Sequence, residues 1–302
     1  PGLDFDFKKF NNCSNQNESA DFILLFEKAR QLLEDGASSI AILLDDIPDH
    51  YTKKLGNKIS EGTSHSNLAN KLFNKLGKID YFVPRIYADE LIKDNPNYLN
   101  DLSISLNLNI KVFYCGPNVV SENLTNYSKI NEILPNKIIF WDNFYSNDYC
   151  PRRLFIGPYV KRKKLHNIMI NPTGLINTDL LILDIIGNSL HQDLSIHKWL
   201  KILNNHDVPL IFNKVKQYFL KPDFGSNPIQ NSLKVNASHF DALEFLLWKW
   251  KGELAREWYP YLFGLKNDMQ INRNLLTSQR VIKTQTQPLS EYINKNFNTG
   301  EM

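Results

Sequence analysis

Two acidic residues stand side by side at the end of an apolar run, in the segment Leu44-Asp45-Asp46-Ile47. Two ionised carboxylates held close together repel each other, and this repulsion raises the pKa of one of them. The pair then offers one charged and one protonated group, which is what acid/base cleavage of a glycosidic bond requires. A turn with one capping and one solvated carboxylate is the alternative interpretation of the same residues.

A second candidate segment combines aromatic and amide side chains around Trp141-Asp142-Asn143. Strand alternation places Trp141 and Asn143 on one face and Asp142 on the other. An indole beside an amide suits a sugar that carries an acetamido group, whereas Asp142 is predicted to be structural. Asp148, in the loop that follows, is placed to accept hydrogen bonds from sugar hydroxyls.

These polar residues follow short apolar runs that are typical of buried strands. The predicted strands are residues 39–44, 79–83, 110–114, 137–141 and 167–170. The stretches between them include helical patterns, at residues 20–35, 64–76, 97–107 and 126–133. Short strands that are apolar on both faces and alternate with helices indicate an α/β fold with a parallel sheet. Polar residues at the carboxyl ends of such strands mark the active edge of a barrel or of a doubly wound sheet. Because no Gly-rich phosphate loop follows any strand, the barrel is favoured.

The chain becomes purely helical in pattern from about residue 176. Thr178 is predicted to cap a helix over residues 180–190. Further helices are predicted over residues 195–204, 208–219, 238–256 and 268–283. The predicted domains are therefore a partial catalytic (β/α) barrel over residues 1–190 and a helical C-terminal region over residues 191–302.

Composition excludes several classes of protein. The chain has 302 residues, of which 42% are hydrophobic, and this fraction argues against disorder. A formal net charge of +3 gives no indication of nucleic-acid binding. No apolar run approaches the roughly 18 residues of a membrane span. Three cysteines without metal-ligand spacing exclude a disulfide scaffold and favour a reducing compartment such as the cytoplasm.

The chain resembles glycoside hydrolase family 84, the β-N-acetylglucosaminidases that include protein O-GlcNAcases. The matching segments run in the family's order and cover about residues 1–190. They are residues 1–4, 41–47, 82–87, 115–120, 141–149, 153–159 and 171–172. Arg85-Ile86 stands where animal members carry Thr-Glu, which indicates a bacterial subgroup.

This resemblance implies a retaining hydrolase that removes terminal β-linked N-acetylglucosamine. The substrate's own acetamido oxygen attacks the anomeric carbon and forms an oxazoline, so the enzyme supplies no nucleophile. Asp45 would orient and polarise the acetamido N–H, while Asp46 would protonate the leaving oxygen and then deprotonate water. The resemblance assigns substrate binding to Tyr87, Trp141, Asn143, Asp148 and Asn171.

The implied partner is a glycan or glycoprotein bearing N-acetylglucosamine, with no cofactor, metal, nucleic acid or membrane involved. Two alternatives stay open: a hyaluronidase-type endo-hexosaminidase and a non-catalytic relic that binds N-acetylglucosamine. In the family, Pro1-Gly2-Leu3-Asp4 follows the third strand of a (β/α)8 TIM-type barrel. The chain is therefore expected to be N-terminally truncated and to hold only strands 4 to 8.

Overall fold

The chain forms two compact units. The computed structural model describes residues 5–13, 18–47, 59–125, 127–147, 153–162, 167–190, 192–220, 235–273 and 275. The first unit comprises Pro1–Ser121, Asn126–Trp141 and Leu165–Met169, and the second comprises Glu122–Thr125, Asp142–Lys164 and Ile170–Met302. The predicted boundary at residue 190 concerns where the catalytic region ends, and it stays a prediction.

A parallel sheet organises the first unit. Its strands are β1 (Ile40–Leu43), β2 (Ile79–Val83), β3 (Lys111–Tyr114), β4 (Ile138–Asp142) and β5 (Ile168–Ile170). They are neighbours in the order β1-β2-β3-β4-β5, and the pairs from β1 to β4 are parallel. All five predicted strands are present within one or two residues at each end. The predicted α/β fold with a parallel sheet is confirmed.

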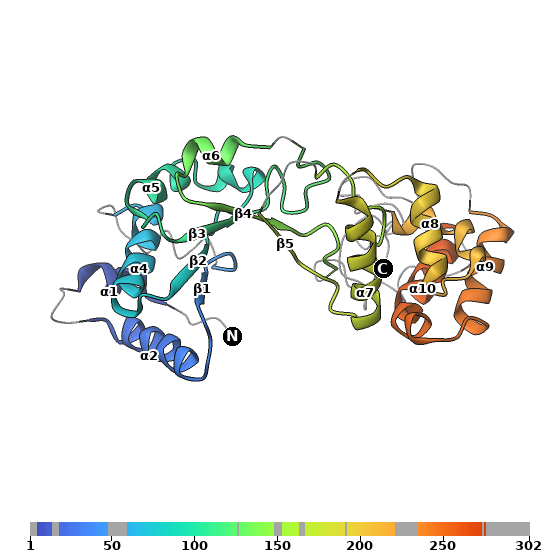
Figure 1. The fold of residues 1–302 in the computed structure, drawn as a ribbon, viewed down its shortest axis with the longest axis horizontal. Helices are drawn as coiled ribbons and strands as arrows, with labels where there is room; N and C mark the ends of the chain where they lie inside the picture. Colours follow the sequence, from blue (N-terminus) through green and yellow to red (C-terminus); the bar gives the residue numbers. More distant parts are fainter. Residues whose placement is uncertain are drawn as a thin grey trace, which may run out of the picture. The chain divides into compact units, whose positions relative to one another are not determined.

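Helices cover one face of this sheet. They are α1 (Phe7–Asn12), α2 (Ala20–Glu34), α4 (Glu61–Leu76), the 3-10 helix η1 (Asp89–Asp94), α5 (Tyr98–Ser105) and α6 (Lys129–Ile133). Figure 1 shows α4, α5 and α6 along one side of the strands. Apolar side chains of these helices and of the strands form one core, which includes Phe22, Leu68 and Phe82.

The other face of the sheet is more exposed at its two edges. Leu43 in β1 is 63% exposed and Met169 in β5 is 47% exposed. The prediction that all strands are buried on both faces is therefore wrong for these edge strands. The physical reason is that the helices of the first unit pack against one face only.

The contact between α4 and α5 depends on Gly62. A Cβ on this residue would lie 2.2 Å from the carbonyl oxygen of Tyr98 and 2.7 Å from the backbone nitrogen of Leu102. Both atoms belong to the backbone of α5, so neither can turn away as the end of a side chain can. We expect Gly62→Ala to lower the free energy of unfolding by about 1–3 kcal/mol, measured by urea denaturation.

The matched control is Gly187→Ala in α7 (Ile176–Ser189), the first helix of the second unit. A Cβ on Gly187 meets no described atom within 4 Å. Alanine should therefore stabilise this helix by about 0.5–1 kcal/mol. If both substitutions had the same effect, the close approach of α4 and α5 would not be the cause.

The second unit is helical around its own core. After α7 it contains α8 (Ile196–Asn205), the 3-10 helices η2 (Leu210–Lys214) and η3 (Lys216–Phe219), α9 (Ala237–Trp248) and α10 (Glu253–Asn272). Trp199 and Trp258 are fully buried in this core. The predicted helix over residues 208–219 is two short 3-10 turns. The part of the predicted helix 268–283 beyond Leu275 lies outside the described residues.

Two helix predictions in this unit are wrong. The predicted helix over residues 238–256 is interrupted at Gly252, whose φ of 124° a helix cannot contain, so α9 and α10 are separate. Thr178 is not an N-cap, because α7 begins at Ile176 and places Thr178 inside its first turn. The hydroxyl of Thr178 instead donates to the carboxylate of Glu257 at 2.7 Å.

Candidate active site

The acidic pair occupies a turn directly after β1. The backbone N–H of Leu44 donates to the carbonyl of Val83 at 2.9 Å, and the N–H of Ile47 donates to the carbonyl of Leu44 at 3.3 Å. Asp45 and Asp46 are the two central residues of this turn. In a regular strand adjacent side chains point to opposite faces, but turn residues are free of that alternation. Both carboxylates are therefore available at the same edge of the sheet.

The two carboxyls differ in their surroundings. Asp45 is half-buried, whereas Asp46 is exposed. Burial raises the pKa of Asp45 above its ordinary value of 3.8, and the negative charge of Asp46 adds to this rise. The raised pKa thus belongs to the residue whose predicted role requires the ionised form, and not to the predicted acid of the pair. It sets a lower pH limit for the role of Asp45.

Tyr87 lies at the same edge, after the end of β2. The backbone N–H of Cys115, which follows β3, donates to the carbonyl of Tyr87 at 2.7 Å. Burial, followed by smaller effects of the thiol of Cys115 and the carboxylates of Asp45, Asp46 and Glu90, raises the pKa of the Tyr87 phenol to about 12. The structure thus brings Tyr87 within electrostatic reach of the acidic pair. At neutral pH the phenol stays protonated and can donate a hydrogen bond.

Cys115 and Glu90 are neighbours of Tyr87 that the sequence reasoning missed. The available signal was the position of Cys115 immediately after an apolar strand, which is the position that identified the acidic pair.

Trp141 forms an aromatic wall beside Tyr87. The two ring centroids are 5.7 Å apart, and the ring of Phe113 lies 6.5 Å from the indole, edge to face. In β4, Ile139 and Trp141 are half-buried, whereas Phe140 and Asp142 are buried. The predicted alternation is confirmed for Trp141 and Asp142, whereas Asn143 lies beyond the end of β4 and is buried.

Asn143 and Asn171 are joined in the second unit. The side-chain amide of Asn171 donates to the Oδ1 of Asn143 at 3.1 Å and to the Oγ of Ser146 at 3.3 Å. The backbone N–H of Asn171 also donates to the carbonyl of Asp142 at 3.0 Å, beside β4. The two predicted amides therefore lie side by side. Asp148, the remaining predicted substrate ligand, lies outside the described residues.

Asp142 has a structural role, as the strand alternation predicted. Its carboxylate accepts hydrogen bonds from the guanidinium of Arg162 at 2.7 and 3.1 Å and from the hydroxyl of Tyr159 at 2.7 Å. It also accepts the backbone N–H of Phe144 at 3.1 Å. Arg162 and Tyr159 donate from their side chains, and Phe144 donates from its backbone. Together these contacts fix the start of the loop that carries Asn143.

Arg85 is directed into the packing of the first unit. Its guanidinium forms a buried ion pair with Glu61 at the start of α4, with 2.8 Å between Nη2 and Oε2. Its backbone N–H donates to the hydroxyl of Tyr98 at 3.0 Å. Arg85 thus joins the end of β2 to α4 and α5.

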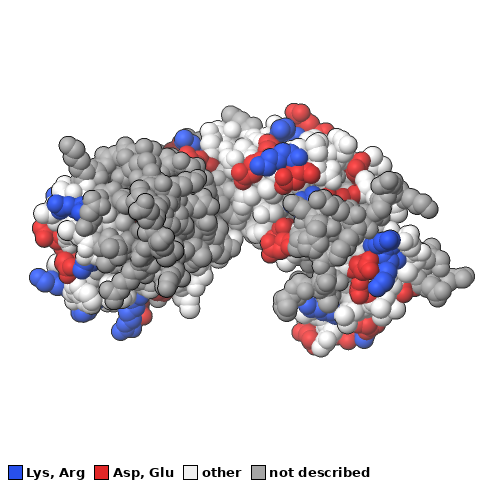
Figure 2. Space-filling view, turned by 180° about the vertical axis from the view of Figure 1, so that it is seen from behind, with Lys and Arg blue, Asp and Glu red and all other residues white. Residues whose placement is uncertain are grey.

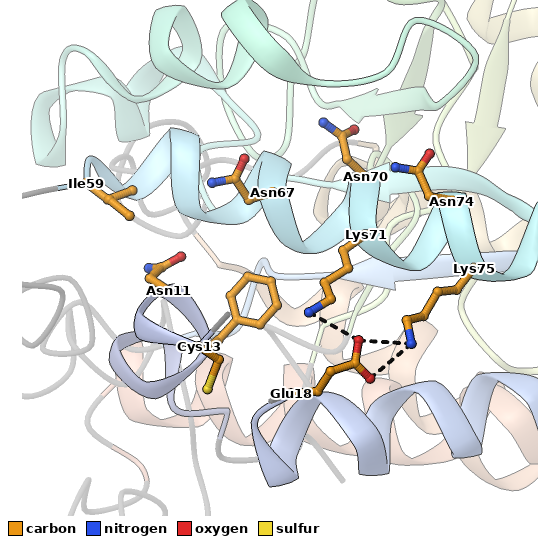
Figure 3. A pocket seen from close by; sticks show the side chains of 10 residues that line it. Asn11, Cys13, Glu18, Ile59, Asn67, Asn70, Lys71, Asn74 and Lys75 are labelled. Atoms are coloured by element: carbon orange, nitrogen blue, oxygen red, sulfur yellow. Dashed lines mark hydrogen bonds and ion pairs between the residues drawn. The ribbon is translucent and has the colours of Figure 1, made fainter. Parts of the chain in front are cut away.

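A cavity of about 550 Å³ lies elsewhere in the first unit and contains none of the predicted site residues. Figure 3 shows Lys71 and Lys75 of α4 both directed at Glu18 across this cavity. Their ammonium groups lie 3.2 and 2.9 Å from one carboxylate oxygen of Glu18. This internal ion pairing partly neutralises the two lysines, and we assign no ligand to the cavity.

The surface and the remaining described side chains add three observations. On the face in Figure 2, Lys and Arg alternate with Asp and Glu over the described residues. Within the described segments, no three His, Cys, Asp or Glu side chains are grouped as a metal site would need. None of the described helices is long and apolar enough to cross a bilayer.

Similar proteins include enzymes of animals and bacteria. Mouse protein O-GlcNAcase is 30% identical over 186 residues, and rat protein O-GlcNAcase is 29% identical over 187 residues. Each alignment covers 57% of this chain, and the chain spans about a fifth (19%) of the length of these relatives. A variant of the O-GlcNAc hydrolase of Thermobaculum terrenum superposes with a TM-score of 0.64 at 19% identity, covering 90% of this chain and 68% of that one. This last similarity concerns the fold.

The sequence model of one family matches residues 1–177, which is more than half of the 302 residues. That segment contains the acidic pair after β1, the Tyr87–Trp141 wall and the Asn143–Asn171 amide pair. The chain belongs to the β-N-acetylglucosaminidase family.

Proposed function

We propose that this protein is a retaining glycoside hydrolase that removes terminal β-linked N-acetylglucosamine by substrate-assisted catalysis. The observation that carries the proposal is the turn after β1, which presents Asp45 and Asp46 together beside Tyr87. Membership of the β-N-acetylglucosaminidase family supports the substrate class. The partner is a glycan or glycoprotein that bears this sugar.

In the first step the acetamido oxygen of the substrate attacks the anomeric carbon, and the bond to the leaving oxygen breaks. Asp46 transfers its proton to that oxygen, while the Asp45 carboxylate accepts the acetamido N–H and stabilises the positive charge that develops there. In the second step Asp46 takes a proton from water, which attacks the anomeric carbon and opens the oxazoline. Two inversions at one carbon give net retention.

The remaining predicted residues would bind the sugar. Trp141 and Tyr87 would form the wall of the acetamide pocket, with the protonated phenol of Tyr87 donating a hydrogen bond. Asn143 would contact the acetamide, whereas Asp148 and Asn171 would hold hydroxyls. The hydrogen bond between Asn171 and Asn143 supports the inclusion of both amides in one site.

We also propose that the five strands correspond to strands 4 to 8 of a (β/α)8 barrel. In a doubly wound sheet the strand order reverses at a switch point, but here neighbours in the sheet are neighbours in the sequence throughout. Helices lie along one side of the strands, as they do outside a barrel (Figure 1). The fold similarity to a bacterial O-GlcNAc hydrolase is in keeping with this arrangement.

The test uses an aryl N-acetyl-β-glucosaminide and a thiazoline mimic of the oxazoline. We expect the purified protein to hydrolyse the glycoside and the thiazoline to inhibit competitively, with a Ki at least about 100-fold below the KM, as transition-state and intermediate analogues bind more tightly than substrates. The matching aryl β-glucoside, which lacks the acetamido group, should not be hydrolysed. Hydrolysis without thiazoline inhibition would contradict the oxazoline mechanism.

A further inference from the structure

The helix α10 contacts both chain segments that follow the amide residues of the candidate site, Asn143 and Asn171. Glu257 and Tyr261 are four residues apart, so they project from the same face of α10. Burial raises the pKa of Tyr261, and the negative charge of Glu257 adds to this rise.

Tyr261 holds the loop that follows Asn143. Its hydroxyl accepts a hydrogen bond from the side-chain amide of Asn147 at 2.8 Å. Asn147 lies between Asn143 and the predicted ligand Asp148 in the sequence, and the loop is folded on itself by a bond of 3.1 Å from the N–H of Ser146 to the carbonyl of Asn143. A shift of Asn147 would therefore be transmitted along this short loop to Asn143.

Glu257 holds the segment that follows Asn171. Its carboxylate accepts four hydrogen bonds at the start of α7, from the backbone and side chain of Asn177 at 2.9 and 2.8 Å and from those of Thr178 at 2.8 and 2.7 Å. The residue before this helix is Leu175, which has no side chain able to cap it. Glu257 therefore supplies the N-terminal cap of α7 from another helix.

The first turn of α7 in turn fixes the residues next to Asn171. Asp179 accepts hydrogen bonds from the backbone and hydroxyl of Thr173 at 2.9 and 2.6 Å and from the N–H of Gly174 at 3.1 Å. A continuous set of polar contacts thus runs from Glu257 through α7 to the segment that begins at Asn171. On the same face of α10, one turn after Glu257, Tyr261 contacts the loop that follows Asn143.

We propose that the Glu257–Tyr261 face of α10 is a positioning element for substrate binding, which aligns Asn143 with Asn171. This inference rests on the proposed hydrolase function for its readout in catalysis. Neither residue takes part in the chemistry. The helical region after residue 190 would accordingly contribute to substrate affinity.

Tyr261→Phe removes the acceptor for Asn147 and keeps the ring, so it tests the element with little change in packing. We expect KM for the aryl N-acetyl-β-glucosaminide to rise about 3- to 10-fold, the range for loss of one hydrogen bond, with kcat within about twofold of wild type. Tyr259→Phe is the matched control, because Tyr259 lies two residues away on the same helix, is 38% exposed and stacks on Phe263. Its KM should not change.

A second readout does not depend on activity. Hydrogen exchange of the backbone N–H groups of Phe144 and Ser146 should become faster in Tyr261→Phe and stay unchanged in Tyr259→Phe. The proposal would be overturned if KM and the exchange rates were unchanged in Tyr261→Phe. It would also be overturned if kcat fell as much as KM rose and the whole protein lost stability. If the wild-type protein hydrolysed no glycoside, the proposed function would fail, and the exchange rates would still decide whether Tyr261 holds the loop.

Discussion

Asp46→Asn is expected to lower kcat/KM about 10²- to 10⁴-fold for a substrate with a poor leaving group, such as a methyl or an alkyl N-acetyl-β-glucosaminide. The carboxyl of Asp46 is exposed to solvent, and the proposed mechanism assigns it to the oxygen of the aglycone. Asparagine keeps the shape of the side chain but cannot transfer a proton. A substrate with a dinitrophenyl leaving group needs no protonation, so its kcat/KM should fall less than about tenfold.

The comparison uses kcat/KM because this ratio reports the step in which the leaving group departs. The later attack of water also needs Asp46 as base, so kcat for the activated substrate is expected to fall even where kcat/KM does not. Azide, a nucleophile that needs no base, should restore kcat for the activated substrate. Equal losses of kcat/KM for both leaving groups would remove Asp46 from the role of the acid.

The fold of the first unit was predictable because its signals are local. A strand such as β2 is a short apolar run with a turn residue at its end, and helix α4 ends at Gly77, whose φ of 65° favours glycine. The helical unit was harder. Whether one helix or two spans residues 238–256 depends on Gly252, and glycine within a helical pattern does not by itself reveal its φ.

The capping of α7 shows a further limit of sequence reasoning. Thr178 precedes an apolar periodic run, as an N-cap residue does, but Glu257 caps the helix from about 80 residues further along the chain. A long-range carboxylate replaced the local signal. The same holds for Tyr261 and Asn147, which are 114 residues apart in the sequence and carry no shared motif.

The candidate site likewise contains residues that the sequence predicts and residues whose orientation it does not predict. The positions of Asp45, Asp46 and Trp141 at the ends of apolar strands identify them from the sequence, whereas the turn that frees the acidic pair from strand alternation is seen only in the structure. The direction in which Arg85 points was not predictable, since either side of the sheet can accept a residue that follows a strand. Its buried partner Glu61 decides the matter.

Asp45→Asn is expected to lower kcat/KM by about 10²- to 10³-fold for both poor and activated leaving groups, the range for loss of one preorganised electrostatic contact. Attack by the acetamido oxygen precedes or accompanies the departure of every leaving group. Loss of the carboxylate that orients the N–H should therefore lower kcat/KM for every substrate. This uniform loss separates Asp45 from Asp46. A loss confined to poor leaving groups would exchange the two roles.

The pH profile tests the same assignment independently. Burial, and then the charge of Asp46, raise the pKa of Asp45 above 3.8, so its carboxylate takes up a proton at a higher pH than an ordinary aspartate. Since the ionised form is the active one, kcat/KM should fall as the pH falls through this raised value. Asp46→Asn removes one of the two causes and should move that acidic limb to lower pH, measured with the activated substrate. Asp45→Asn should abolish the limb, because the group that titrates is gone, whereas a limb unchanged in both variants would assign it to another residue.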